Sequence, residues 1–355
     1  MTGHHQRIRL AVATLAVLTG CGPEPALEVS RLSMIDEADQ EGVQGETSGQ
    51  EDADEVDVNG APVLAGAPVL TGCELGTAST TGAPLPQGCS NNGTLLASSL
   101  AWVSLDSITM PDGSVASSVS LQGTRFVGTV NGVEVSGEAF VGARFNGTAT
   151  NGSAVQVRLD GAVPGSLRQP DVWRYEFSYL NPKGDWKHLC KSNKRTVVVS
   201  GRWSYHQGDP GDGAKTNDPT VFTIGCRRSA IAKCIDAGYK PWVEVGDLSL
   251  DQFHQACVRM MRADYCGNGI SHTRPGRKLV LYDVLGIQVD DRNWVREAAW
   301  TTGGARCLNA ANLTQEQAPC GIPVTKECGE VSSSDADTLL ISEIPKRGAR
   351  DGHWH

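Results

Sequence analysis

The chain has 355 residues, of which 39% are hydrophobic and 20% are charged, with 41 glycines and 5 methionines. This composition is typical of a globular protein rich in turns and strands, with one large or two ordinary domains. The net charge of −9 comes from one segment, because residues 61–355 hold 28 basic and 28 acidic side chains. A neutral domain has no surplus of Lys and Arg to neutralise phosphates, which excludes nucleic acid as a partner.

The N-terminal segment has the pattern of an export signal. Arg7 and Arg9 precede an apolar run over Leu10–Val17, and no acidic residue lies before Cys21. The run is shorter than the roughly 20 apolar residues that a membrane-spanning helix needs. The letters LTGC that end at Cys21 resemble the lipobox of bacterial lipoproteins, in which the cysteine is acylated. We therefore predict a signal peptide over residues 1–20 and a lipid anchor on Cys21.

The next segment is strongly acidic. Residues 22–60 hold twelve acidic side chains and one basic side chain, and they are nearly free of aromatics. Such a composition cannot bury enough apolar surface to fold, and its charges repel one another. We predict a disordered acidic tether over residues 21–72. Gly22 in place of an aspartate implies, by the resemblance to lipoproteins, sorting to the outer membrane, on its periplasmic face or at the cell surface.

Strand patterns follow from about Leu95 to Tyr205, and we predict a β-rich region over residues 73–170. The strands are separated by turn pairs that supply positive φ, namely Asp112-Gly113, Asn131-Gly132, Asn146-Gly147 and Asn151-Gly152. Four aromatics alternate with polar residues on one face of a later strand: Trp173, Tyr175, Phe177 and Tyr179. We interpret them as a core face; an exposed platform for a sugar or a peptide is the alternative.

From Thr223 onward the pattern indicates short helices interrupted by cysteines. Ser229 can cap one helix, and Ser249 can cap a second with Gln252 completing a capping box. On the second helix the spacing of Phe253, Cys257, Met260 and Asp264 predicts that Cys257 faces the core while Arg259 and Arg262 face away.

The sequence beyond this helix is assigned from local signals. Gly267 is expected to end the helix. A strand is expected over Lys278–Tyr282, a short helix over Trp294–Trp300 and a disordered tail over residues 331–355. The predicted fold class is therefore α+β, an antiparallel β-rich region followed by a disulfide-rich mixed segment of short helices and strands.

Ten of the 11 cysteines remain once Cys21 is set aside, and an exported chain holds such cysteines as disulfides. We favour one local pair, Cys73 with Cys89, because they flank a short loop. The remaining pairing is left open among Cys190, Cys226, Cys234, Cys257, Cys266, Cys307, Cys320 and Cys328.

Several motifs resemble one family. The run RADYCGNGISHT over Arg262–Thr273, together with AIAKCIDAGYKPW, LCKSNKR and WTTGGARC, resembles the ADYC-domain proteins of myxobacteria. The family takes its name from the letters found here at Ala263–Cys266. The resemblance implies an ADYC-type cysteine-rich domain over residues 171–330 and a lipoprotein-like N-terminus, but no particular activity.

The same segment holds the residues with the most reactive chemistry. His254, Cys257, Cys266 and His272 have spacings compatible with zinc, although structural disulfides are the commoner use of exported cysteines. Cys266 as a nucleophile with His254 or His272 as base and Asp264 as orienter is a second alternative. A helix C-terminus would raise the pKa of that thiol, which argues against it. Asp264 is more readily interpreted as a cap or as a partner of Arg262 or Arg274.

One other segment invites a function. The loop Asp209–Asp218 carries several carboxylates, but its spacing is that of a polar turn and not of a calcium loop. No phosphate loop, serine elbow or HExxH pattern is present in the sequence.

We expect a lipid-anchored protein of the cell envelope that acts as a non-catalytic binding or structural module, without a cofactor. Its partners would be the membrane, through the lipid, and an envelope protein or glycan. The alternative is an envelope hydrolase that uses a thiol or a metal in residues 253–273.

Overall fold

The computed structural model describes part of the chain. The chain divides into two compact units, Met1–Asp52 and Ala53–His355, and all described residues belong to the second. They are residues 69–70, 100–190, 195–272, 278–289, 294–309, 320, 322, 328 and 338–345. The predicted signal peptide, the lipid site at Cys21, most of the tether and the Cys73–Cys89 pair lie outside these residues.

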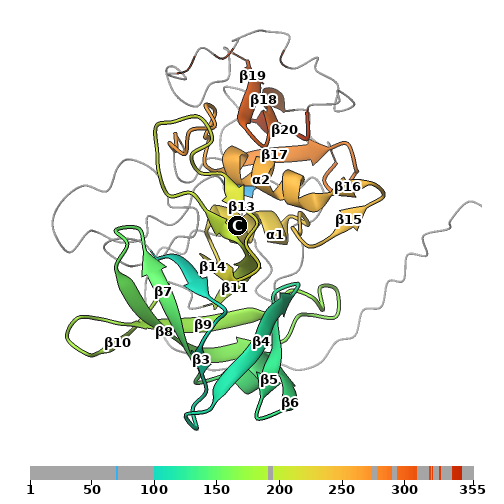
Figure 1. Ribbon diagram of the computed structural model, residues 1–355. Coiled ribbons are helices and arrows are strands. Elements are labelled where there is room, and N and C mark those ends of the chain that lie inside the picture. The colour runs from blue at the N-terminus through green and yellow to red at the C-terminus, as the bar shows by residue number, and fades with distance from the viewer. Residues whose placement is uncertain are drawn as a thin grey trace, which may run out of the picture. The chain divides into compact units, whose positions relative to one another are not determined.

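A closed antiparallel barrel of six strands forms the centre of the larger sheet (Figure 1). β2 pairs with β7 on one side and with β14 on the other, and the ring continues through β8, β9 and β11. The six strands are β2 (Leu100–Ser104), β7 (Arg144–Ala149), β8 (Ala154–Val163), β9 (Arg174–Leu180), β11 (Arg195–Ser200) and β14 (Val221–Cys226). Three of these strands precede residue 170 and three follow it, so neither stretch closes the barrel alone.

Five further strands extend this sheet, and a short 3₁₀ turn packs beside them. The strands are β3 (Ile108–Thr109), β4 (Val115–Gln122), β5 (Arg125–Val130), β6 (Val133–Ser136) and β10 (Trp186–His188), and the turn is η1 (Gly137–Phe140). At Asn131-Gly132 both residues have positive φ, 51° and 80°, as the tight β5–β6 hairpin requires.

One predicted turn is wrong. Asn146-Gly147 lies within β7. A Cβ on Gly147 would lie 2.8 Å from Cδ1 of Leu100 on the neighbouring strand β2. The glycine therefore makes room for a core side chain and does not reverse the chain.

Aromatic side chains fill the barrel. Phe126 is 0% exposed, and its ring centroid lies between 5.1 and 5.7 Å from those of Phe140, Phe145, Tyr175 and Phe222. Of the four alternating aromatics, Tyr175 and Phe177 are buried, while Trp173 and Tyr179 pack against the same core with part of their surface exposed. The interpretation of this face as a core face is confirmed.

A second antiparallel sheet lies near the C-terminus, in the order β1, β17, β20, β18 and β19. Its strands are β1 (Val69–Leu70), β17 (Lys278–Asp283), β20 (Leu340–Ile344), β18 (Val295–Thr301) and β19 (Gly304–Leu308). β17 confirms the predicted strand. β1 shows that the end of the predicted tether is part of this sheet.

Two predictions fail in the second sheet. The expected helix over Trp294–Trp300 is β18, because its pairing with β19 and β20 outweighs the helix propensity of Arg, Glu and Ala. The expected tail over residues 331–355 contains β20, which lies between β17 and β18 and is buried.

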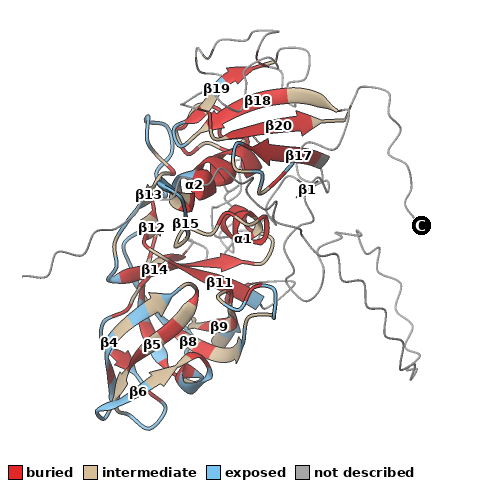
Figure 2. Cartoon of the chain, turned by 90° about the vertical axis from the view of Figure 1, so that its right-hand side faces the viewer, coloured by how far each residue is buried: buried red, intermediate tan, exposed pale blue. Residues whose placement is uncertain are grey.

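Two helices lie between the barrel and the second sheet, and both are largely buried (Figure 2). Helix α1 (Ala230–Asp236) begins at Ser229 and contacts β14, and helix α2 (Leu250–Met261) begins at Ser249 and contacts β18. The Ser249 cap accepts from the amide of Asp251. Small hairpins complete the structure: β12 (Arg202–Trp203) with β13 (Lys215–Thr216), and β15 (Glu244–Val245) with β16 (Leu248–Ser249). None of the helices in the described ranges is long and apolar enough to cross a bilayer.

The predicted α+β class is wrong, because the structure is mostly β. Among the described residues, strands account for 46% and helical residues for 12%, with two α-helices. The helices predicted from the caps at Ser229 and Ser249 are confirmed, but the cysteine-rich segment also contains strands that pair with distant parts of the chain. Such pairings leave no local signal of the kind that a capped helix leaves.

The barrel core gives a stability prediction. Phe126→Ala removes a ring that contacts four others, so we expect unfolding to become easier by about 3 to 5 kcal/mol. Chemical denaturation with the disulfides intact measures this. The control Val133→Ala changes a side chain that is 64% exposed, and should stay within about 0.5 kcal/mol of the parent. Equal effects of the two changes would contradict the described core.

Candidate functional site

His254, the first residue of the predicted site, lies in the core. It is 0% exposed, and its Nε2 lies 3.1 Å from the carbonyl oxygen of Ile231 on α1. Burial lowers the pKa of His254 to about 4, so the imidazole is neutral at pH 7. The residue holds α2 against α1 and has no exposed surface from which it could reach a dissolved substrate.

The predicted thiol and metal ligands are used in disulfides. Cys257 is bonded to Cys234, which joins α2 to α1, and Cys266 is bonded to Cys320. The other described bridges are Cys190–Cys226 and Cys307–Cys328. Within the described ranges no group of three or more His, Cys, Asp and Glu is placed to hold a metal ion. The four disulfides indicate an oxidising environment outside the cytoplasm.

Asp264 pairs with an arginine that the sequence did not point to. Its carboxylate forms a salt bridge with Arg259, and the two side chains are 0% and 1% exposed. It also accepts from the amides of Asn268 and Gly269, at 3.1 and 3.0 Å. The carboxylate therefore neutralises a buried cation and fixes the turn after α2. Arg274 lies outside the described residues.

The prediction that Arg259 and Arg262 face solvent is wrong, because both are buried. Arg259 donates to the carbonyl oxygens of Asp212 and Thr302, and Arg262 donates to that of Gly269 at 2.6 Å. These carbonyls and Asp264 replace the water that two charged side chains would lose on burial.

The run Ala263–Cys266 forms a tight buried turn. Helix α2 ends at Met261, and Ala263 has the left-handed φ of 49° that turns the chain. The Tyr265 hydroxyl donates to Glu297 at 2.7 Å, and its ring stacks on Trp300 with 5.2 Å between centroids. The Cys266 disulfide then holds the far end. Each residue of the run thus has a structural role.

Gly267 does not end the helix as predicted. Its φ is 63°, and a Cβ there would lie 1.7 Å from the carbonyl oxygen of Gly303. Only glycine can occupy this contact between the turn and the β18–β19 hairpin. His272, the other predicted base, is partly buried and stacks on Tyr265 with 6.2 Å between centroids.

The buried turn supports an exposed loop. We call Tyr205–Gly211 the aromatic loop; all seven residues are exposed, and it is the olive segment at the upper left of Figure 1. The amides of Gly208 and Gly211 donate to the carbonyls of Asn268 and Gly267, both at 2.9 Å. Arg259 holds the carbonyl of Asp212 just beyond it. The loop is therefore fixed by backbone contacts to residues that Asp264 organises.

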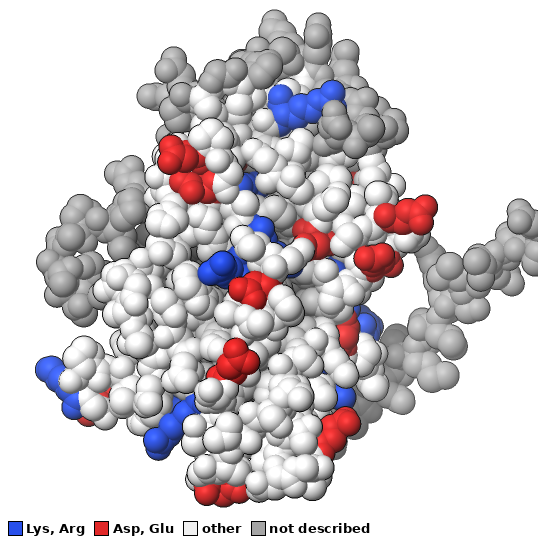
Figure 3. All heavy atoms as spheres, in the orientation of Figure 1, with Lys and Arg blue, Asp and Glu red and all other residues white. Residues whose placement is uncertain are grey.

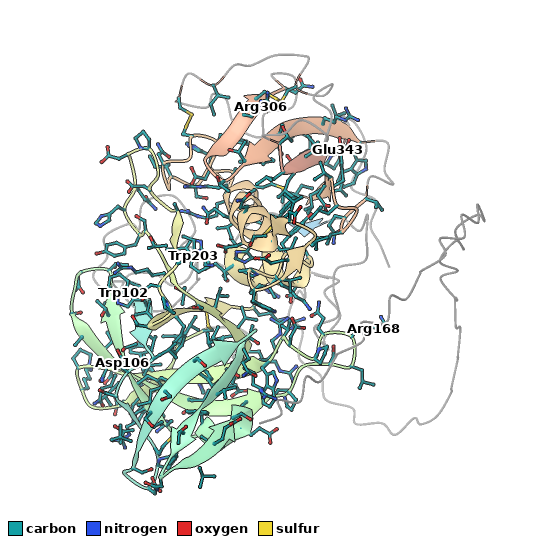
Figure 4. All side chains as sticks on the ribbon, turned by 45° about the vertical axis from the view of Figure 1, so that its right-hand side comes forward. Trp102, Asp106, Arg168, Trp203, Arg306 and Glu343 are labelled. Carbon is teal, nitrogen blue, oxygen red and sulfur yellow. A yellow bond between two sulfur atoms is a disulfide. The ribbon has the colours of Figure 1, made fainter. Side chains whose placement is uncertain are left out.

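The aromatic loop lies against two side chains from the barrel and β12. Tyr205 stacks on Trp102 of β2 with centroids 6.2 Å apart, and the His206 ring lies 4.4 Å from that of Tyr205. The guanidinium of Arg202, which is on β12, lies 5.2 Å from the ring centroid of Trp102. We call Arg202, Trp102, Tyr205 and His206 the aromatic column. Figure 4 shows Trp102 on the same side of the molecule as Trp203, with Arg168 on the other side.

The predicted polar turn over Asp209–Asp218 uses its carboxylates for local contacts. Asp212 accepts from the amide of Asp209 at 3.0 Å. Asp218 accepts from the amide and hydroxyl of Thr220, and the hydroxyl bond lowers the pKa of that carboxylate. These contacts cap turns.

The aromatic column has almost no signal in the sequence. Trp102, Tyr205 and His206 come from segments about a hundred residues apart in the chain. The one local signal is that Trp102 alternates with Ala101 and Val103 in a strand pattern, which points its side chain away from the core.

The salt bridge below the loop gives the second prediction. Asp264→Asn keeps the shape of the side chain but leaves Arg259 charged and buried, so we expect a loss of about 3 to 5 kcal/mol of stability. Faster hydrogen exchange of the Gly208 and Gly211 amides should accompany it, because their acceptors would no longer be fixed. Asp209→Asn, in the exposed loop, is the control. Unchanged exchange in the Asp264 variant would contradict the supporting role of the turn.

Comparison with known proteins finds one family. The model of the ADYC domain matches residues 137–314, a range that contains the buried turn, the aromatic loop and both helices. No curated protein and no solved structure matches the chain. The matched range covers half of the chain and includes the run ADYC at Ala263–Cys266. The chain therefore belongs to the ADYC-domain family.

Proposed function

We propose that this protein is exported, anchored to a membrane by a lipid on Cys21, and acts in the cell envelope as a non-catalytic binding module. Its ligand would contact the aromatic column. The observation that carries the proposal is the contrast between the ADYC run and the loop beside it. The side chains of Asp264, Tyr265 and Cys266 are each held in a structural contact, with Arg259, Glu297 and Cys320, while the loop that the run supports is exposed.

Loops held by a rigid scaffold are common places for ligand binding. The aromatic loop is held at Gly208 and Gly211, so it needs little further ordering when a ligand binds. Trp, Tyr and Arg, which are frequent in binding sites, lie together in the column. The aromatic loop and the aromatic column therefore form the proposed ligand-binding surface.

Export and lipid attachment rest on the N-terminal sequence, with support from the disulfides. The basic and apolar start and the LTGC run at Cys21 form one continuous pattern. The disulfides fit a chain that leaves the cytoplasm. The acidic segment over residues 22–60 would separate the folded part from the membrane surface by charge repulsion.

The hydrolase alternative has less support. It would require reduction of the Cys234–Cys257 or Cys266–Cys320 disulfide, or exposure of His254. Among the described residues, no observation favours either change.

The lipid anchor can be tested by Cys21→Ser in the full chain, expressed in a bacterium with an alkyne-labelled fatty acid. We expect the parent to incorporate the label and to enter the detergent phase, and the variant to do neither. Cys73→Ser alters the second LTGC copy, at residues 70–73, and should behave as the parent. A Cys21→Ser protein that still carries the label would refute acylation at this position.

The binding site can be tested without knowing the ligand. Benzoylphenylalanine at position 206 of the full chain should form a discrete adduct in irradiated cells, because His206 lies exposed beside Tyr205. The same residue at position 133, which is 64% exposed on the β5–β6 hairpin, should form none. No adduct at position 206, or equal adducts at both positions, would contradict a ligand at the aromatic column.

A further inference from the structure

We infer that the aromatic column binds an uncharged carbohydrate chain. This inference rests on the proposed function, since it names the ligand class of the same site. It follows from how the rings are stacked, from the charge around them and from the side chains that are missing there.

The rings of the column are offset. The 6.2 Å between the Trp102 and Tyr205 centroids, with 30° between the planes, exceeds the spacing of about 3.5 to 4.0 Å between atoms in contact. The rings therefore overlap only in part, and Tyr205 is 36% exposed. The exposed part of the Tyr205 ring is the surface that the C–H groups of a sugar ring, which carry a small positive charge, can pack against.

The positive charge of Arg202 in the aromatic column is compensated by a nearby carboxylate. Arg202 lies 4.0 Å from Asp218, whose carboxylate stays ionised because Thr220 donates to it. The Arg202 guanidinium also lies over the Trp102 ring. Figure 3 shows that charged side chains on the face turned toward the viewer are scattered, with a broad uncharged area at left centre. A ligand with a strong charge of either sign would find no surplus of the opposite sign.

Among the described residues, the aromatic column and the aromatic loop contain no large exposed aliphatic side chain. The exposed large hydrophobic residues are Val115, Val133, Val141, Val163, Leu167, Tyr205, Val245, Leu248, Val284 and Val289. Of these, Tyr205 alone belongs to the column, and the one other apolar side chain that the aromatic loop exposes is the small ring of Pro210. A stable protein partner requires about 800 Å² per side around an apolar centre. Rings with a polar rim suit a sugar better than a protein.

The rim supplies hydrogen-bonding groups that suit hydroxyls. His206 and Gln207 are exposed on the loop, and Ser104 and Thr148 are partly exposed on β2 and β7. Thr148 pairs directly with Trp102 across the two strands. Imidazole, amide and hydroxyl groups both donate and accept, as the hydroxyls of a sugar do.

The test uses the full chain in detergent micelles with three probes: chitotetraose, maltohexaose and cellohexaose. Ligand-observed NMR and calorimetry should detect at least one of them. Tyr205→Ala should weaken that binding about three- to tenfold, as expected for one lost aromatic contact. Tyr205→Phe, which keeps the ring, should change it less than Tyr205→Ala does.

Trp186→Ala is the matched control. Trp186 is partly buried on β10, where Arg144 and Arg158 lie over its ring, and its loss should leave sugar binding unchanged. The inference is overturned if none of the probes binds, or if Trp186→Ala weakens binding as much as Tyr205→Ala.

The adduct at position 206 separates this inference from the proposed function. An adduct whose added mass is a polypeptide would overturn the carbohydrate while keeping the binding function. An adduct whose added mass is a glycan would support both.

Discussion

The buried ion pair between Arg259 and Asp264 is the interaction on which the rest of the structure depends. Both side chains are withdrawn from water, which costs several kcal/mol for each charge unless other bonds compensate. Here the compensation comes from three separate places: the carbonyl of Asp212, the carbonyl of Thr302 and the amides after Asp264. One pair thus connects helix α2, the β18–β19 hairpin and the segment that follows the aromatic loop.

This arrangement explains why the most reactive residues of the family motif are engaged in structural contacts. Ala263 turns the chain, Asp264 neutralises Arg259, Tyr265 reaches Glu297 and Cys266 forms a disulfide. These contacts satisfy each polar group internally, as buried polar groups require. The motif is therefore part of the architecture, and the surface available for recognition lies on the loop that the motif fixes.

Much of the local structure could be predicted from the sequence. The helix starts at Ser229 and Ser249 and the hairpin at Asn131-Gly132 have short-range signals, since a cap or a positive φ involves neighbouring residues. The strand over Val295–Thr301 and the strand over Leu340–Ile344 have no such signal. They exist because they pair with each other across more than thirty residues, and that pairing outweighs local propensity.

The candidate site likewise combines features that are local in the sequence with contacts between distant segments. The export pattern, the acidic segment, the ten further cysteines and the ADYC run can be recognised without a structure, because composition and short motifs are local properties. The pairing of the cysteines, the partnership of Arg259 with Asp264 and the contact of Trp102 with Tyr205 depend on the folded chain. Each of these contacts joins side chains from different elements, and the closing of the barrel and the packing of α2 bring those elements together.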